Sequence, residues 1–290
     1  MMKTFLACVM SLFMGIALCD AAVIVTQAYR MFTIDFDDYD GSGFQPGGGA
    51  GTFDSNNIHI EGASDGVLNF GDTKTTGDFA RGNSSGGETT GGLWNFTAKG
   101  VSTFGVQPSS NDFNGPGTGD FVEFLFENGL GRSVNSLTLQ YDIFQHNDQD
   151  RSTSVIPYIS TDGSNYQQMP GMGMTTLEAA DASPKWFVTF QNNNTFMEIN
   201  DGDSVYVRFV FADAGGSGSR DEIGLANVAL LLGSRSVPEP QTAALAGLGI
   251  LGLRYLRRTR TRLNIFRRRR RTRDNNSGWK RGSKMSKSEY

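Results

Sequence analysis

The sequence predicts an all-β fold, a sandwich of antiparallel strands, over residues 23–234. Short runs in which apolar and polar residues alternate predict strands, because successive side chains of a strand point to opposite faces. In one such run, Leu137, Leu139 and Tyr141 would share a face. A sheet with one apolar face needs a second sheet to cover it. Since hardly any helical pattern separates the strands, we expect them to pair antiparallel.

Residues 1–22 precede this body and predict a signal peptide. A lysine near the start is followed by an apolar run from Phe5 to Leu18 and by a small-residue exit at 21–22. This order is typical of an export signal that signal peptidase removes. Lipid attachment at Cys19 is the alternative, but it needs a small residue in place of Leu18. We therefore expect export and loss of both cysteines, which lie in this segment.

The body predicts seven strands joined by turn-rich segments. The alternating runs are 31–36, 121–126, 136–144, 152–160, 185–190, 204–211 and 223–232. Residues 162–165, Asp-Gly-Ser-Asn, predict a hairpin turn. The one segment in which we expect a short helix is 175–182. With two histidines, His59 and His146, and no cysteine after the signal, disulfide frameworks and sites with several imidazoles are excluded.

A short hydrophobic helix is predicted after the body. The prolines of Pro-Glu-Pro at 238–240 end any preceding strand, so a helix begins only beyond them. The apolar stretch 241–256 is at the short limit for crossing the ~30 Å of hydrocarbon in a bilayer. Arginines at its end place that side in the cytoplasm and the body outside. These arginines are Arg254, Arg257 and Arg258.

This order of Pro-Glu-Pro, short hydrophobic helix and arginine cluster closely resembles the PEP-CTERM sorting signal of Gram-negative bacteria. The resemblance covers residues 237–258. It implies an intermediate anchored in the inner membrane, which a transpeptidase called an exosortase cuts near Pro-Glu-Pro and passes to the cell surface or the extracellular space. The recognition residues that it implies are Pro238, Glu239 and Pro240, in a sorting motif that begins at Val237.

Charge is distributed unevenly between the body and the end of the chain. Residues 254–290 carry a net charge of +13 and residues 1–253 a net charge of −17, within a total of −4. The tail 259–290 contains the five-arginine run 267–271 and no apolar period, which predicts disorder. We interpret it as a cytoplasmic anchor on phospholipid, with nucleic-acid contact as the alternative. The acidic body predicts little affinity for nucleic acid.

Within the body, residues 119–232 resemble a jelly-roll module that is frequent in exported proteins of this type. The resemblance rests on a strand entry at 151–154, a hairpin at 158–163, a strand at 202–209 and a closing segment at 223–228. It implies a jelly-roll-like fold and no particular activity. Related carbohydrate-binding sandwiches often end on an Asp-Asn or Asp-Asp pair that holds a structural calcium, where this chain has Ala226 and Asn227.

Aspartates near the start of the body are the candidate metal ligands. Asp35, Asp37, Asp38 and Asp40 precede Gly41. On a strand Asp35 and Asp37 would share a face, and alternating carboxylates suit Ca²⁺. The alternative is a solvated strand exit. We expect no other cofactor.

For each of the other candidate residues, a purely structural role is an alternative to a functional one. Gly82–Gly86 fits Gly-x-Ser-x-Gly around Ser84, but a nucleophile elbow needs a strand and a helix that this glycine-serine loop lacks. His146 is expected on an exposed loop. A sugar-stacking platform and a buried aromatic core are both open for Trp94, Tyr166 and Trp186. Four carboxylates are considered as an acid–base pair, without a pattern that joins them: Asp148, Asp150, Asp221 and Glu222.

The sequence thus predicts an exported protein sorted to the cell surface or the extracellular matrix. We expect its sandwich to be a non-catalytic structural or adhesive module, because nucleophile, metal and acid–base patterns are weak. The alternative is a carbohydrate-binding module that recognises an exopolysaccharide or another glycan. The expected partners are signal peptidase, an exosortase and the membrane.

Overall fold

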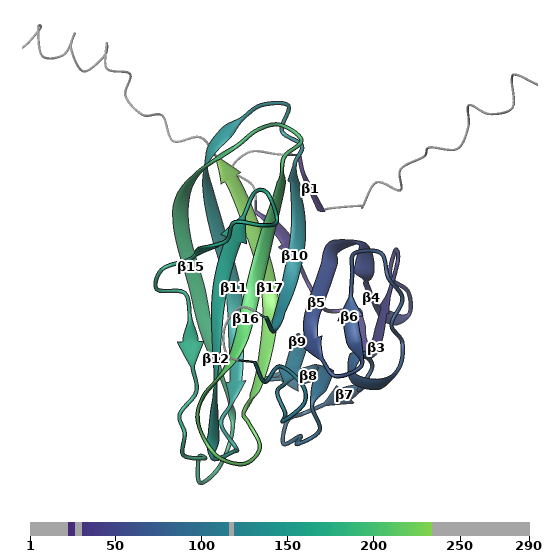
Figure 1. The fold of residues 1–290 in the computed structure, drawn as a ribbon, viewed down its shortest axis with the longest axis vertical. Coiled ribbons are helices and arrows are strands. Elements are labelled where there is room, and N and C mark those ends of the chain that lie inside the picture. Colours follow the sequence, from purple (N-terminus) through teal and green to yellow (C-terminus); the bar gives the residue numbers. More distant parts are fainter. Residues whose placement is uncertain (1–22, 27–30, 116–118, 234–290) are drawn as a thin grey trace, which may run out of the picture. The chain divides into compact units, whose positions relative to one another are not determined.

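The computed structural model describes residues 23–26, 31–115 and 119–233, and these form two main β-sheets and one small sheet (Figure 1). The predicted signal peptide (1–22), the predicted helix (241–256) and the basic tail (259–290) lie outside the described residues. Within the described residues, no helix is long and apolar enough to cross a membrane.

Sheet A has eight strands, and its ordered path is β13-β12-β16-β10-β5-β6. Strand β1 pairs parallel with β10, and β14 pairs antiparallel with β12. The strands are β1 (Val23–Val25), β5 (Ile58–Ala63), β6 (Gly66–Leu68), β10 (Phe121–Asn128), β12 (Arg151–Ser160), β13 (Gln167–Gln168), β14 (Met174–Thr175) and β16 (Ser204–Gly216).

Sheet B has seven strands, in the order β15-β11-β17-β9-β8-β7, with β2 paired to β17. Its long strands are antiparallel, and the two-residue β7 pairs parallel with β8. The strands are β2 (Phe32–Ile34), β7 (Asn83–Ser84), β8 (Gly92–Ala98), β9 (Val101–Gln107), β11 (Val134–His146), β15 (Trp186–Ile199) and β17 (Glu222–Gly233).

The remaining elements are short and lie in the first half of the body. A third sheet pairs two strands in parallel, and two 3₁₀ helices each have three residues. They are β3 (Tyr39–Gln45), β4 (Gly51–Asp54), η1 (Ser55–Asn57) and η2 (Gly77–Phe79).

The long strands confirm the all-β, mainly antiparallel prediction. All seven alternating runs contain strands, from β2 to β17. The run 185–190 continues to Ile199 because its asparagine-rich second half keeps pairing with β11. The predicted helix at 175–182 is wrong. Thr175 ends β14, and the chain then runs irregularly, with the Asp181 amide donating to the Asn147 carbonyl.

A single large hydrophobic core joins sheets A and B. In β11, Leu139, Tyr141 and Ile143 belong to it, and Phe209 from β16 meets the Tyr141 ring edge-on at 4.9 Å. The Tyr141 hydroxyl donates to the Met172 carbonyl, so this buried polar group is satisfied. The other face of each sheet points away from this core, and on sheet B it carries a second, smaller apolar cluster.

Candidate functional site

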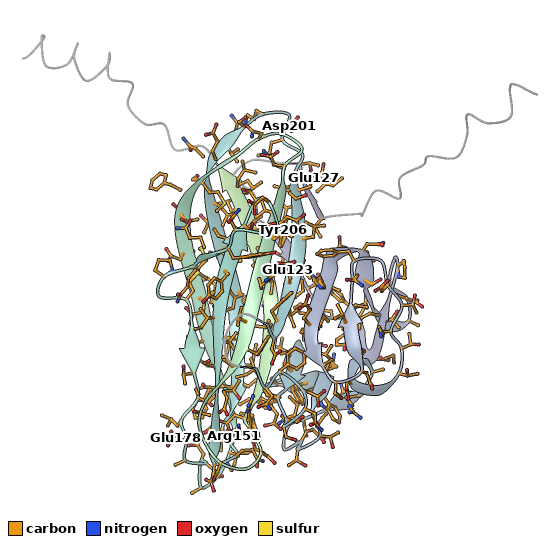
Figure 2. The ribbon with its side chains drawn as sticks, in the orientation of Figure 1. Glu123, Glu127, Arg151, Glu178, Asp201 and Tyr206 are labelled. Carbon is orange, nitrogen blue, oxygen red and sulfur yellow. The ribbon has the colours of Figure 1, made fainter. Side chains whose placement is uncertain are left out.

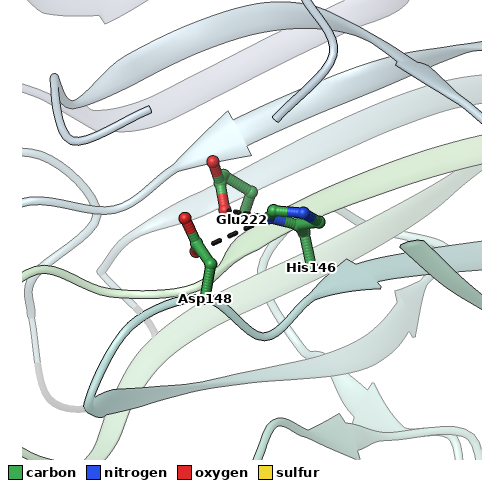
Figure 3. A group of neighbouring side chains, drawn as sticks. All are labelled: His146, Asp148 and Glu222. Atoms are coloured by element: carbon green, nitrogen blue, oxygen red, sulfur yellow. Dashed lines mark hydrogen bonds and ion pairs between the residues drawn. The ribbon is translucent and has the colours of Figure 1, made fainter. Parts of the chain in front are cut away.

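Three ionisable side chains converge at one end of sheet B (Figure 3). His146 ends β11 and Glu222 begins β17, and these two residues are opposite each other in the antiparallel register. Asp148 follows two residues after His146. The Nδ1 atom of His146 lies 3.2 Å from Glu222 Oε2 and 3.6 Å from Asp148 Oδ1. We call these three residues the His146 triad.

The alternation of β11 directs the triad away from the main core. Because Tyr141 and Ile143 face that core, Phe144 and His146 face the other side of the sheet. There Phe144 joins a second, smaller apolar cluster that includes Phe96 and Trp186. The His146 ring packs against the Trp186 ring with centroids 5.1 Å apart. The Trp186 indole N–H in turn donates to the Ser85 carbonyl at 2.7 Å.

The loop after β7 covers the triad. Glu222 Oε1 accepts hydrogen bonds from the amides of Gly87 (2.5 Å) and Glu88 (2.6 Å). Gly86 has a φ of +106°, and a Cβ atom there would lie 3.2 Å from the Trp186 ring and 3.3 Å from His146 Nδ1. The absence of a side chain at Gly86 thus lets the loop close on the site.

Burial and mutual charge shift the pKa values in the triad. Burial raises the pKa of Glu222 to about 7, and the Asp148 carboxylate adds to this shift. The Asp148 and Glu222 carboxylates raise the pKa of His146 to about 9. Burial acts upward on the pKa of Asp148, but hydrogen bonds with His146, Glu222 and Gln149 and the charge of His146 outweigh it, so the net shift is downward. Next to the triad, burial raises the pKa of Asp221 to about 6.

A second histidine–carboxylate group lies on sheet A. Glu123 on β10 is buried, with 2% of its side chain exposed, and it accepts from Tyr166 Oη at 2.6 Å and from Arg208 Nε at 3.0 Å. His59 Nδ1 lies 3.6 Å from Glu123 Oε1. The Arg208 guanidinium stacks on two rings, 3.6 Å from the centroid of Phe121 and 3.8 Å from that of Tyr166. We call His59, Glu123, Tyr166 and Arg208 the Arg208 cluster.

The Arg208 cluster keeps its carboxylate ionised. Burial acts upward on the pKa of Glu123, but hydrogen bonds from His59 and Tyr166 and the charge of Arg208 outweigh it, so the pKa is lowered. Burial and the neighbouring Glu123 raise the pKa of Tyr166. Each charge in this cluster therefore has a partner of the opposite sign.

The candidate calcium ligands Asp35 and Asp37 are both exposed. Strand β2 ends at Ile34, and Asp37 lies in the turn that follows, so the two carboxylates do not share a strand face. Among the described residues, the three side chains that lie close enough together to share a metal ion are His146, Asp148 and Glu222.

Two of the three aromatic residues considered for a sugar platform lie on sheet B, and the third lies outside the strands. Trp94 and Trp186 both pack against Phe96 on sheet B, with centroid distances of 6.1 Å and 5.3 Å. Trp186 is only 8% exposed. Tyr166 belongs to the Arg208 cluster, beside sheet A. The structure therefore does not bring Tyr166 together with the two tryptophans.

The structure also places His146 and Ser84, the two single residues considered in the sequence. His146 is a half-buried strand residue, so its placement on an exposed loop is wrong. Ser84 ends the two-residue β7, and its hydroxyl donates to Glu88 Oε1 at 2.7 Å. The strand–turn–helix context that a nucleophile elbow needs is not present around Ser84.

A protein-sorting motif is recognised near the C-terminus of the sequence. The profile of the PEP-CTERM protein-sorting motif matches residues 236–260. The chain carries a PEP-CTERM protein-sorting motif. The matched range contains the seven residues expected for sorting, from Val237 to Arg258. The motif implies an exported protein that is anchored in the membrane before an exosortase cuts it.

No curated protein matches the chain in sequence. Solved structures with a similar body include a non-crystalline cellulose specific carbohydrate-binding module, at 14% identity and a TM-score of 0.32, covering 51% of this chain and 86% of that one. A mannan-recognising carbohydrate-binding module, TmCBM27, has 15% identity and a TM-score of 0.29, covering 48% and 78%. The K3 adhesin domain of Lys-gingipain from Porphyromonas gingivalis w83 has 16% identity and a TM-score of 0.27, covering 45% and 74%.

Proposed function

We propose that this PEP-CTERM protein reaches the cell surface or the extracellular matrix and that its sandwich is a non-catalytic structural or adhesive module. The observation that carries the proposal is the sorting motif, which begins three residues after β17 ends at Gly233. A folded domain followed directly by a sorting signal is delivered as one unit. The function of the domain then depends on its exposed surface.

The buried state of the ionisable groups supports a non-catalytic domain. A general acid or base must come within hydrogen-bond reach of its substrate. Glu222 is fully buried under the Gly87 and Glu88 amides, and Asp221 is also buried. Both described histidines are engaged with carboxylates. Turnover on a panel of glycosides that is abolished by Glu222→Gln would contradict this part of the proposal.

Strand β15 supports an adhesive role. It ends the ordered path of sheet B and has 14 residues. Four of its apolar side chains are exposed, Phe187 (49%), Val188 (42%), Phe190 (60%) and Phe196 (62%). Exposed apolar side chains on a long sheet edge favour association with another surface.

The sorting part of the proposal is tested by changing Glu239 to alanine in the native host. We expect the uncut precursor to accumulate in the membrane fraction, because the motif no longer directs cleavage. Glu127→Ala, on the described body, is the control and should leave processing unchanged. Normal release of the Glu239→Ala protein would contradict exosortase sorting.

Glycan binding is the second candidate, and the surface around the Arg208 cluster favours it. Tyr158 on β12 is the register partner of Arg208 on β16. Tyr206 also lies on β16, two residues before Arg208. Figure 2 shows Tyr206 and Glu123 in the middle part of sheet A. Tyr158 and Tyr206 are half-buried and share a sheet face with Arg208, whose guanidinium stacks on Tyr166. Aromatic rings with charged hydrogen-bonding groups suit sugars.

Glycan arrays and pull-down on exopolysaccharide separate the two candidates. A glycan-binding module predicts saturable binding that Tyr158→Ala weakens and that Phe190→Ala on β15 does not. A structural or adhesive module predicts no saturable sugar binding in either protein.

A further inference from the structure

The His146 triad holds negative charge that no described lysine or arginine balances. Of the other buried carboxylates, Asp78 and Glu123 each pair with an arginine, whereas Asp112 and Asp221 accept hydrogen bonds without an ion pair among the described residues. Within the part of the chain that the structure describes, the ion pairs of Asp148 and Glu222 go only to His146. Burying carboxylates without matching positive charge is costly. The triad therefore has the electrostatic character of a cation site.

One oxygen of the triad takes part in the ion pair with His146 but has no hydrogen-bond partner among the described residues. Only 10% of the Asp148 side chain is exposed, and this atom, Oδ1, is buried. This is the oxygen that lies 3.6 Å from His146 Nδ1. Leaving such an atom unsatisfied costs about 1–3 kcal/mol, and more for a charged group. A bound cation would satisfy it.

The three side chains are oriented by contacts that leave one ligand atom of each directed inward. Glu222 Oε1 is held by two loop amides, which leaves Oε2. Asp148 Oδ2 accepts from Gln149 Nε2 at 2.9 Å, which leaves Oδ1. The His146 ring is fixed against Trp186. Outer contacts that orient ligands in this way are typical of metal sites.

The spacing of these atoms fits a small tetrahedral ion. Ligands about 2.1 Å from such an ion lie about 3.4 Å from each other. The Nδ1 atom of His146 is 3.2 Å and 3.6 Å from the two carboxylate oxygens, and all three atoms lie within 4.8 Å of one another. A cation between them needs only small side-chain shifts and leaves a fourth position for water.

We propose that His146, Asp148 and Glu222 bind one divalent first-row transition cation of the Zn²⁺ class. Imidazole nitrogen with two carboxylates suits such an ion, whereas Ca²⁺ prefers six to eight oxygen ligands. The ion displaces the proton from Nδ1, and its two positive charges balance the two carboxylates. It joins the end of β11 to the start of β17 and, through Glu222, fixes the loop that contains Gly87. The site is separate from Asp35 and Asp37.

The test uses the protein purified after export, treated with a chelator and dialysed against Zn²⁺ or Co²⁺. We expect one equivalent of tightly bound metal, a tetrahedral Co²⁺ absorption spectrum and a higher Tm with Zn²⁺. His146→Asn and Glu222→Gln should each weaken binding by more than about 100-fold, because even contacts outside a ligand set are worth about 10- to 100-fold. The matched control is His59→Asn, which removes the other described histidine and should keep full binding.

Two results would overturn the proposal. One is a chelated protein that takes up no stoichiometric Zn²⁺ or Co²⁺. The other is binding that His146→Asn leaves intact or that His59→Asn removes. Melting of every variant without metal shows that it is folded, and if His146→Asn fails to fold, Glu222→Gln decides. Glu222→Gln keeps the oxygen that accepts from the Gly87 and Glu88 amides, so loss of metal without loss of the fold is the expected result.

Discussion

The two described histidines each lie beside a buried glutamate on the outer side of a sheet, yet their surroundings differ in charge. On sheet A, Glu123 has Arg208, Tyr166 and His59 as partners, and its pKa is lowered. On sheet B, Glu222 has His146 and a second carboxylate, and its pKa is raised to about 7. The Arg208 cluster is complete as it stands, whereas the His146 triad accommodates one more positive charge. The balance of charge, more than the residue types, therefore distinguishes a self-contained ion-pair cluster from a candidate ligand site.

The largest effect is expected when the arginine is removed from sheet A. Arg208→Met leaves Glu123 buried without its cation, and breaking such a pair costs about 3–5 kcal/mol. Urea unfolding measures this loss. Arg151→Met is the control, because its partner Asp213 is more exposed and also pairs with Arg220, so a loss under about 1 kcal/mol is expected. Equal losses of unfolding free energy in the two variants would mean that the burial of Glu123 does not increase the cost of removing its arginine.

A smaller effect is expected when a side chain is added over the triad. Gly86→Ala places a methyl group against Trp186 and His146 at a positive φ, and we expect a loss of about 2–3 kcal/mol. At Gly47 the φ is +75°, and a Cβ would meet nothing within 4 Å. Gly47→Ala should therefore cost only about 1 kcal/mol for the backbone conformation. Thermal unfolding compares the two, and an equal cost would mean that the loop is not held tightly on the triad.

Removing a charge from sheet B should have little effect without metal. Glu222→Gln keeps the loop hydrogen bonds and leaves Asp148 as the ion-pair partner of His146, so the metal-free protein should change by less than about 1 kcal/mol. Glu123→Gln on sheet A should cost clearly more, because Arg208 then loses its partner. Denaturant unfolding of both variants in the presence of a chelator is the measurement. The reverse order of the two losses would contradict the distinction drawn between the sites.

Acidification should reduce the stability that the Arg208 cluster gives to the fold, whereas this stability should stay constant around neutral pH. The pKa of Glu123 is lower in the folded protein, so its ionised form stabilises the fold above the usual glutamate range. That stability is lost as the pH falls through the lowered pKa. Unfolding of the wild type and Glu123→Gln from neutral to strongly acidic pH shows this as a difference that shrinks on acidification. A difference that stays constant would exclude linkage to Glu123.

The long strands were predictable, and the short ones were not. In β11 and β16 a strict alternation places apolar residues on one face, and burial against the other sheet follows. The strands from β3 to β9 are rich in glycine, and their packing depends on close backbone contacts. At Gly41 (φ +83°), for example, a Cβ would lie 2.1 Å from the Gly82 carbonyl oxygen. Such contacts join distant segments, so no local pattern reveals them.

The candidate site was only partly readable for a similar reason. His146 and Asp148 lie two residues apart, which on an extended chain indicates one face. Their partner Glu222 comes from a strand 76 residues later and is set by the register between β11 and β17. Knowledge that the last strand pairs antiparallel with β11 would have joined them. Asp35 and Asp37 were predicted as metal ligands because several aspartates lie close together in that part of the sequence. Exposed carboxylates at a turn, however, are readily solvated by water.

Mass spectrometry of the mature protein from its native host tests whether the chain is exported and sorted by its C-terminal motif. We predict a protein that lacks the signal peptide and whose new C-terminus lies near Glu239. An intact chain from Met1 to Tyr290, recovered from the cytosol, would contradict it.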